Sequence, residues 1–166
     1  MTFLRENSLE IRLPAEATGR RFDGDDHSLS HCMKAVDFII ELPDRIYYIE
    51  IKDPDQTANE VRRKQFSDEL SSGKIDEELK TKFRDTWIYE WAERRIAGKP
   101  IYYLILIAFE QLTAAELSAR KAGMERKLPI LGPNKRNWQR PFVIGCAVFN
   151  LAAWNRTFAN MPIRRV

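Results

Sequence analysis

Two carboxylates and one lysine are the residues of this chain whose types and spacing best suit chemistry. Twelve residues separate Asp37 from the run Glu50-Ile51-Lys52. Carboxylate oxygens are the ligands that Mg²⁺ prefers in proteins, and a lysine shifts its pKa readily with its surroundings. These residues therefore suit a site for a hard divalent cation.

The surrounding sequence predicts a β-hairpin that brings the two acids together. Two apolar runs, Ala35–Leu42 and Ile46–Ile51, are separated by Pro43-Asp44-Arg45, and turn residues between two such runs are typical of a hairpin. A symmetric turn sets Asp37 directly opposite Glu50. Opposed side chains have Cβ atoms about 4.5–5.5 Å apart, and opposed like charges destabilise a hairpin. A cation between the two carboxylates would relieve that repulsion.

Side chains alternate between the two faces of a strand, so the hairpin has one apolar and one polar face. The apolar face requires a core and carries Val36, Phe38, Ile40, Tyr47, Ile49 and Ile51. The other face carries Asp37, Ile39, Glu41, Tyr48, Glu50 and Lys52. Its three central charges suit a metal site or, alternatively, an ordinary solvated face.

The order of Asp37 and Glu50-Ile51-Lys52 resembles the PD-(D/E)XK nuclease superfamily, also called restriction endonuclease-like. In that superfamily an Asp on one strand and a (D/E)-x-K on the next bind Mg²⁺ and activate water. The resemblance implies that Asp37 and Glu50 are metal ligands, that the Ile51 backbone carbonyl is a third, and that Lys52 assists the water or holds a phosphate oxygen. Val36 stands where the family often, but not always, has proline.

The resemblance also implies accessory residues outside the hairpin. The superfamily begins with a helix that often aims an acidic residue at the metal. Glu6 and Glu10 are the candidates here, with Glu10 preferred. Residues 2–13 read equally well as such a helix or as an alternating strand. RecB-like members carry a glutamine on the helix after the E-x-K strand, which Gln65 matches, but Glu69 replaces the tyrosine found four residues later.

Two long helices are expected after the hairpin. Thr57 with Glu60 fits a capping box for a helix from Ala58 to about Leu70. A second helix runs towards Gly98, with an apolar stripe that predicts core residues. That stripe consists of Ile75, Leu79, Phe83, Trp87, Ile88, Trp91, Ala92 and Ile96.

The other segments complete an α/β (α+β) arrangement. Strands are expected at 100–109 and 142–150, and helices at 114–124 and 151–158, whereas 14–31 and 127–141 read as loops. Residue types that bind transition metals occur in and just after the first loop: Asp25, Asp26, His27, His31 and Cys32. Their spacing matches no recognised set of metal ligands, so a mobile acidic loop is the favoured interpretation. We therefore expect one domain over residues 1–166, a restriction endonuclease-like mixed sheet flanked by helices. The resemblance covers roughly residues 1–110.

Basic residues gather in two places that suit phosphate contacts. One is the start of the first helix, with Arg62, Arg63 and Lys64; the other is the 120–140 stretch, which includes Lys135, Arg136 and Arg140. Clustered cations attract nucleic-acid phosphates. A merely solvated surface remains the alternative reading of both.

These observations lead to a main expectation and two alternatives. The main one is a nuclease that hydrolyses DNA phosphodiesters with Mg²⁺ or Mn²⁺. The alternatives are an inactive module that binds nucleic acid or a protein partner, and a domain that associates through an exposed surface around Ile39 and Tyr48, for example as a homodimer. The 166 residues contain no long apolar run and no signal-peptide pattern, so a cytoplasmic location without a membrane partner is expected.

Overall fold

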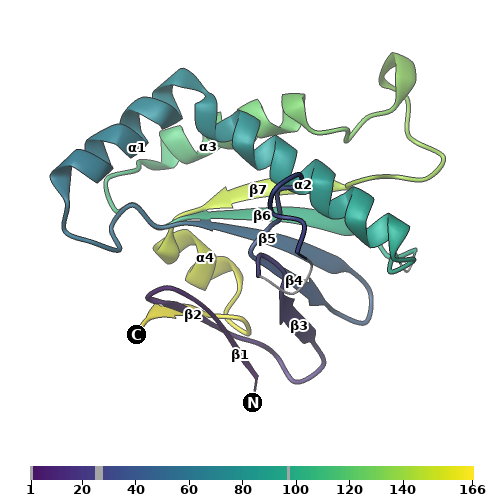
Figure 1. The fold of residues 1–166 in the computed structure, drawn as a ribbon, viewed down its shortest axis with the longest axis horizontal. Helices are drawn as coiled ribbons and strands as arrows, with labels where there is room; N and C mark the ends of the chain where they lie inside the picture. The colour runs from purple at the N-terminus through teal and green to yellow at the C-terminus, as the bar shows by residue number, and fades with distance from the viewer. Residues whose placement is uncertain (1, 25–27, 97) are drawn as a thin grey trace.

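The computed structural model describes residues 2–24, 28–96 and 98–166. In this part of the chain a five-stranded mixed sheet lies at the centre (Figure 1). Neighbours are antiparallel from β3 to β5 and parallel from β5 to β7. The strands, in spatial order, are β3 (Thr18–Arg21), β4 (Phe38–Glu41), β5 (Ile46–Lys52), β6 (Ile101–Ile107) and β7 (Gly145–Phe149).

Helices cover one face of this sheet, and a helix with a small second sheet covers the other (Figure 1). The first face carries α1 (Glu60–Ser72), α2 (Lys74–Ala92) and α3 (Ala114–Lys127), which connect the parallel strands β5, β6 and β7. The opposite face carries α4 (Leu151–Thr157) and a three-stranded sheet of β1 (Phe3–Glu6), β2 (Leu9–Arg12) and β8 (Ile163–Arg165). The expected mixed sheet flanked by helices is confirmed at this level.

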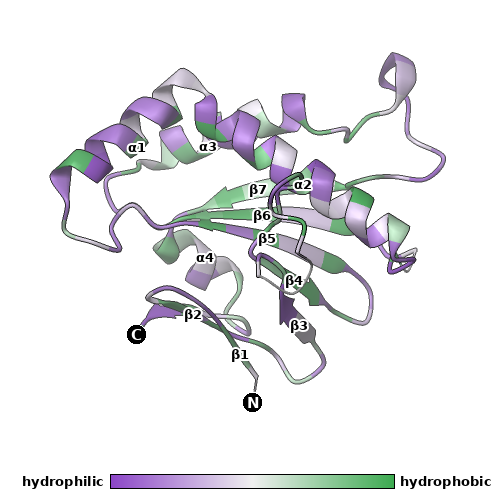
Figure 2. Cartoon of the chain, viewed as in Figure 1, coloured by the Kyte–Doolittle hydropathy of each residue, from purple (hydrophilic) through white to green (hydrophobic). Residues whose placement is uncertain are grey.

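A separate core lies on each side of the central sheet, because alternate residues of every central strand point to opposite faces. On the α2 side, Tyr48 and Tyr103 pack around Phe83 with ring centroids 5.8 and 5.4 Å away. On the other side, Phe38 and Ile49 pack in the cluster that contains Trp154. The strands accordingly appear apolar along much of their length (Figure 2).

The hairpin has the expected register. Phe38 pairs with Ile49, Glu41 pairs with Ile46, and the turn closes with Leu42 N–H donating to the Arg45 carbonyl over 2.9 Å. Regular pairing stops at Phe38, so Asp37 comes just before β4 in the position that faces Glu50. The prediction of the face carrying Tyr48 and Ile39 as an exposed surface was wrong: they are 1% and 5% exposed, because α2 covers them.

The segments near the N-terminus differ in part from expectation. Of the two alternatives for residues 2–13 the strand is confirmed, because they form the β1–β2 hairpin and no helix. The 14–31 segment, expected as a loop, contains β3 at the edge of the central sheet. Val36 packs on the α2 side, not with Phe38, because it precedes the regular strand. Asp25, Asp26 and His27 of the proposed transition-metal reading lie outside the described residues.

Differences in the helical part concern helix ends and the C-terminus. Asn59, not Thr57, caps α1, accepting from Val61 and Arg62 N–H, whereas the Thr113–Glu116 capping box of α3 forms as its sequence suggests. The predicted apolar stripe is fully buried only up to Phe83. Trp87 and Ile96 are partly buried and pack against the core, whereas Ile88 and Trp91 are 44% and 62% exposed. The short strand β8 had no sequence signal. None of the described helices has the length and apolar character needed to cross a membrane.

Truncation of Phe83 should test the core beneath α2. Phe83 is 1% exposed between Tyr48 and Tyr103, so Phe83→Ala should lower the free energy of unfolding by about 3–5 kcal/mol. Urea denaturation followed by circular dichroism measures this. Val61→Ala on α1, where the side chain is 76% exposed, is the control and should stay within about 0.5 kcal/mol of wild type. A small loss for Phe83→Ala would contradict this packing.

Candidate active site

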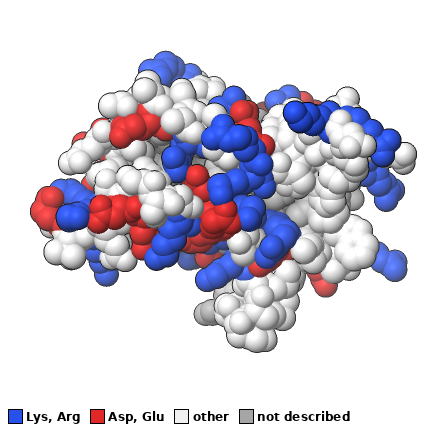
Figure 3. All heavy atoms as spheres, turned by 90° about the horizontal axis from the view of Figure 1, so that it is seen from above, with Lys and Arg blue, Asp and Glu red and all other residues white. Residues whose placement is uncertain are grey.

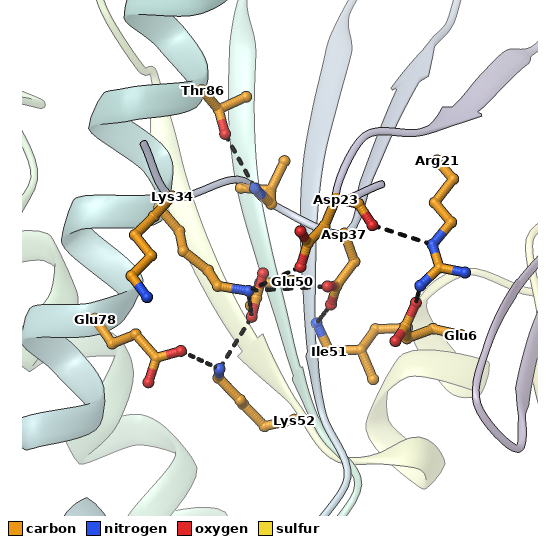
Figure 4. A network of polar contacts seen from close by, with 12 residues as sticks. Glu6, Arg21, Asp23, Lys34, Asp37, Glu50, Ile51, Lys52, Glu78 and Thr86 are labelled. Carbon is orange, nitrogen blue, oxygen red and sulfur yellow. Dashed lines mark hydrogen bonds and ion pairs between the residues drawn. The ribbon is translucent and has the colours of Figure 1, made fainter. Parts of the chain in front are cut away.

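The end of the β4–β5 hairpin places two carboxylates in the interior of the protein. Asp37 is 4% exposed and Glu50 is fully buried. Where β4 is no longer paired, Asp37 Oδ2 accepts a hydrogen bond of 2.6 Å from Ile51 N–H. The Asp37 side chain therefore takes the place of a backbone acceptor where the hydrogen bonds between β4 and β5 end. It lies beside the β5 residues 50–52 (Figure 4).

A row of polar residues on α2 holds the segment that leads into β4. The Thr86 hydroxyl accepts from Val36 N–H over 3.0 Å, and Asp85 accepts from Lys34 N–H over 3.0 Å. Both side chains are buried on the helix face that turns towards the sheet. Backbone groups that would otherwise lack partners are thus satisfied by α2, and Asp37 is fixed one residue beyond Val36.

Two lysines, one from β5 and one from α2, surround the buried Glu50 carboxylate. Glu50 Oε1 lies 2.7 Å from Lys82 Nζ and 3.1 Å from Lys52 Nζ. Lys82 Nζ also lies 3.9 Å from Asp37 Oδ1 and 3.7 Å from Asp23 Oδ2, and it is only 8% exposed as a residue. Lys82 therefore occupies the position between the carboxylates where the sequence suggested a cation.

The outer part of the network connects Lys52 to α2. Lys52 Nζ lies 2.7 Å from Oε1 of Glu78 (Figure 4). Glu78 precedes Lys82 on α2 by one helical turn. On the opposite side, Glu6 pairs with Arg21 over 2.9 Å. Glu50 Oε2 is buried and accepts no hydrogen bond within the described residues. One oxygen at the centre of the site is thus left without a donor.

Burial makes both central carboxylates resist ionisation. It raises the pKa of Glu50 to about 7, with the charge of Asp37 adding to the effect, and it raises the pKa of Asp37 to about 6 although Lys82 and Ile51 N–H act in the other direction. Burial also disfavours the Lys82 ammonium, but Glu50 and Asp37 outweigh it and raise the pKa of Lys82. The site therefore stabilises positive charge strongly.

The residues present fit a divalent cation held by few side chains. Ile51 N–H points to Asp37, and because the N–H and C=O of a strand residue point to the same side, the Ile51 carbonyl is directed to that edge as well. The described residues contain no group of three His, Cys, Asp or Glu side chains able to hold a metal. Mg²⁺ commonly takes one or two carboxylates and keeps several waters, which matches Asp37, Glu50 and the unpartnered Oε2.

The structure separates the accessory residues suggested by the sequence. Glu10 is bound by Arg5 and Arg164 in the small sheet, over 2.7 and 2.8 Å, and neither Asp37 nor Glu50 is among its contacts. Glu6, the other candidate, does reach the network: burial raises its pKa, and the charge of Glu50 adds to that rise. Gln65 hydrogen-bonds Glu69 on its own helix, outside the central cluster.

The predicted phosphate-binding residues occupy two different surfaces. On α1, Arg63 pairs with Asp55 and Glu60, and Lys64 pairs with Asp68, so much of the charge there is already compensated. Arg62 lies between them on the exposed helix. Lys135, Arg136 and Arg140 lie in the segment before β7 and form no ion pair within the described part of the chain.

Lys82 and Glu78 are the central residues that sequence reasoning missed. A signal for them exists in retrospect. Polar residues recur along α2 beside the apolar stripe, at the spacing of one helical turn. They are Glu78, Lys82, Asp85, Thr86 and Glu90.

Comparisons with protein-family models, with curated proteins and with solved structures find no match to this chain.

The raised pKa of Glu50 predicts a pH-dependent stability in the absence of metal. Its folded value of about 7 lies above the ordinary 4.5, so the folded protein binds the proton more tightly than the unfolded chain. That stabilisation is complete below about pH 4.5 and is lost as the pH rises to 7. The unfolding free energy of wild type minus that of Glu50→Gln should therefore fall, by an order of 1–3 kcal/mol, over this range in EDTA.

Glu77→Gln provides a control of opposite sign. Hydrogen bonds from Lys127 and Lys80 lower the pKa of the exposed Glu77 to about 2. The unfolding free energy of wild type minus that of Glu77→Gln should therefore increase as the pH rises from about 2 to 4.5 and then stay constant. Urea titrations at a series of pH values measure both differences. A Glu50 difference that rises with pH would show that its carboxylate is stabilised, not destabilised, by folding.

Proposed function

We propose that this protein is a metal-dependent nuclease of the PD-(D/E)XK type that hydrolyses phosphodiester bonds of DNA. The observation that carries the proposal is the convergence of Asp37, Glu50 and Lys52 at the end of a buried hairpin. Glu50 has one oxygen without a donor, and Asp37 is held against the Ile51 backbone. Buried acids with raised pKa values are typical of functional sites.

The arrangement of the chain agrees with a restriction endonuclease-like fold in its central part. A β4–β5 hairpin carries the motif, α1 and α2 follow it, and β6 lies parallel beside β5. One departure concerns the N-terminus, where a strand hairpin stands in place of the helix that the superfamily has first. The acidic accessory residue would accordingly be Glu6 on β1.

Each residue of the site has a role that its position supports. Asp37, Glu50 and the Ile51 carbonyl would hold Mg²⁺ or Mn²⁺, which supplies Lewis acidity and an acidified water when bound. Lys52, at the open end of β5 and 19% exposed in its side chain, orients or deprotonates the water or holds a phosphate oxygen. Glu78 fixes the Lys52 ammonium from α2.

One observation favours a second candidate, an inactive module of the same fold. Two ammonium groups already balance the two central carboxylates, and Lys82 contacts Glu50 at 2.7 Å. In the inactive module this network is permanent and purely structural. In the nuclease Glu50 would help to hold a metal ion, and Lys82 would then turn to Asp23, 3.7 Å away, as its alternative partner. Metal binding therefore distinguishes the two candidates.

Removal of the Lys52 amine should abolish cleavage without unfolding the protein. We expect Lys52→Ala to lower the rate about 10²–10⁴-fold, the range for loss of a group that transfers protons in catalysis. Supercoiled plasmid and single-stranded circular DNA with Mg²⁺ or Mn²⁺ are suitable substrates. Lys74→Ala removes the same charge from an exposed site at the start of α2, where Lys74 pairs with Glu69, and should cleave like wild type. Undiminished cleavage by Lys52→Ala would remove Lys52 from the mechanism.

Melting temperatures should reveal a metal site without any substrate. A cation that binds only the folded state adds about 2.7 kcal/mol at one hundred times its dissociation constant. Asp37→Asn keeps an acceptor for Ile51 N–H but loses the charge, so it should melt near wild type in EDTA and lose most of the Mn²⁺ response. Asp37→Ala also loses the acceptor, and its unfolding free energy should fall by about 1–3 kcal/mol.

Lys82→Met tests whether the amine and the metal compete. Loss of one partner of a buried ion pair costs about 3–5 kcal/mol, so this variant should be less stable in EDTA. Its stabilisation by Mn²⁺ should equal or exceed that of wild type, because the Lys82 ammonium no longer competes with the metal for Glu50. If neither wild type nor Lys82→Met responds to millimolar Mn²⁺, the inactive module is the better description.

A further inference from the structure

A large groove lies between the C-terminal part of α2 and the segment before β7. It has a volume of about 1000 Å³. We call it the tryptophan groove. Its lining includes Trp87, Trp91, Arg136, Trp138, Arg140 and Phe142.

The aromatic residues of the tryptophan groove are held in place rather than loosely exposed. Phe142 lies between the other two rings, with centroids 4.6 Å from Trp87 and 5.1 Å from Trp138. Trp138 Nε1 donates to the Pro129 carbonyl over 2.9 Å. Gly132 packs so tightly on this ring that an added Cβ would lie 3.2 Å from Trp138 Cδ2. These contacts preform one wall of the groove.

Trp91 lies on α2, one helical turn after Trp87, and has a largely free ring. It is 62% exposed and makes no ring contact within the described residues. Exposure of an indole to water beside further aromatic rings is unfavourable, and exposed apolar patches commonly mark binding sites. The apolar spacing of α2 predicts that Trp91 packs in the core, but its ring is exposed. Packing within the protein therefore does not account for a tryptophan at this position.

Uncompensated positive charge borders the same groove. The side chains of Arg136 and Arg140 are exposed and form no ion pair or hydrogen bond in the described part of the chain. Viewed from above, Lys and Arg atoms border a broad uncharged surface at the end of the molecule that carries this segment (Figure 3). The groove therefore combines flat aromatic faces with free cations, and a partner should offer flat rings and anions.

We infer that the tryptophan groove binds single-stranded nucleic acid, with unpaired bases stacking on Trp91 and Trp138 and phosphates contacting Arg136 and Arg140. Aromatic platforms with a positively charged border are the usual means of binding single strands. A duplex does not offer free base faces for such stacking. A symmetric contact with a second copy would bring the same arginines towards each other, so charge disfavours that occupant.

This surface is distinct from the candidate active site. Trp91 lies nine positions after Lys82, about two and a half turns, which puts the two side chains on opposite sides of α2. The tryptophan groove would therefore hold a strand away from the point of cleavage. The inference extends the proposed nuclease function by naming its substrate as single-stranded, but binding itself needs neither the metal nor Lys52.

Fluorescence anisotropy with labelled single-stranded (dT)₂₀ in EDTA tests the inference, because no cleavage can occur there. Trp91→Ala should weaken binding about 5- to 100-fold, the effect of losing one stacked base, without changing the salt dependence. Trp91→Phe should recover much of the affinity. Replacing Arg136 and Arg140 together by alanine should weaken binding and reduce the slope of log affinity against log salt by about 1.4.

Arg156→Ala, an exposed arginine on α4, is the matched control and should bind like wild type. A parallel arm with (rU)₂₀ distinguishes RNA from DNA as the preferred strand. The inference is overturned if Trp91→Ala binds normally, if a duplex of equal length binds as tightly, or if polyglutamate competes as well as (dT)₂₀. It is also overturned if light scattering shows a dimer that Trp91→Ala dissociates. If the protein neither cleaves DNA nor responds to metal, the proposed nuclease function fails, but the binding of (dT)₂₀ in EDTA still tests the tryptophan groove.

Discussion

The contact between Lys82 and Glu50 is the interaction on which the arrangement of the site depends. A carboxylate as deeply buried as Glu50 is unfavourable in its charged form unless a cation accompanies it. Lys82 provides that cation from α2, and Lys52 provides a second from β5 itself. The pair therefore joins the helix layer to the sheet at a position where the apolar core between them is interrupted.

The rest of α2 is organised around this interruption. Its apolar residues up to Phe83 pack on Tyr48 and Tyr103, whereas its polar row binds the backbone before β4 through Asp85 and Thr86. Near its C-terminal end the helix carries the exposed Trp91. One helix thus supports the core, positions Asp37 and forms a wall of the tryptophan groove.

The sequence was sufficient for the hairpin register, because a proline-containing turn and alternating apolar residues determine pairing locally. It also indicated the order of most helices and strands and the capping box at Thr113. It could not show that Ile39 and Tyr48 are buried, since that depends on α2 packing over the polar face. For the same reason Lys82 was missed: a single lysine within an amphipathic helix becomes significant only when its position over Glu50 is known. The pairing of β8 with β2 depends on contacts between the two ends of the chain, which no local pattern encodes.

The charge balance of the site shows how the proposed metal-dependent function could coexist with stable folding. With Asp37 and Glu50 ionised and both lysines protonated, the four central groups carry no net charge. A divalent cation added to this set would create an excess of positive charge in a buried region, which is unfavourable. In the proposed nuclease, metal binding would therefore be coupled to a shift of Lys82 away from Glu50, and Asp23 at 3.7 Å, itself about half exposed in its side chain, lies on the side towards solvent. The lysine that lets the acids be buried would thus also set how readily a metal could replace it.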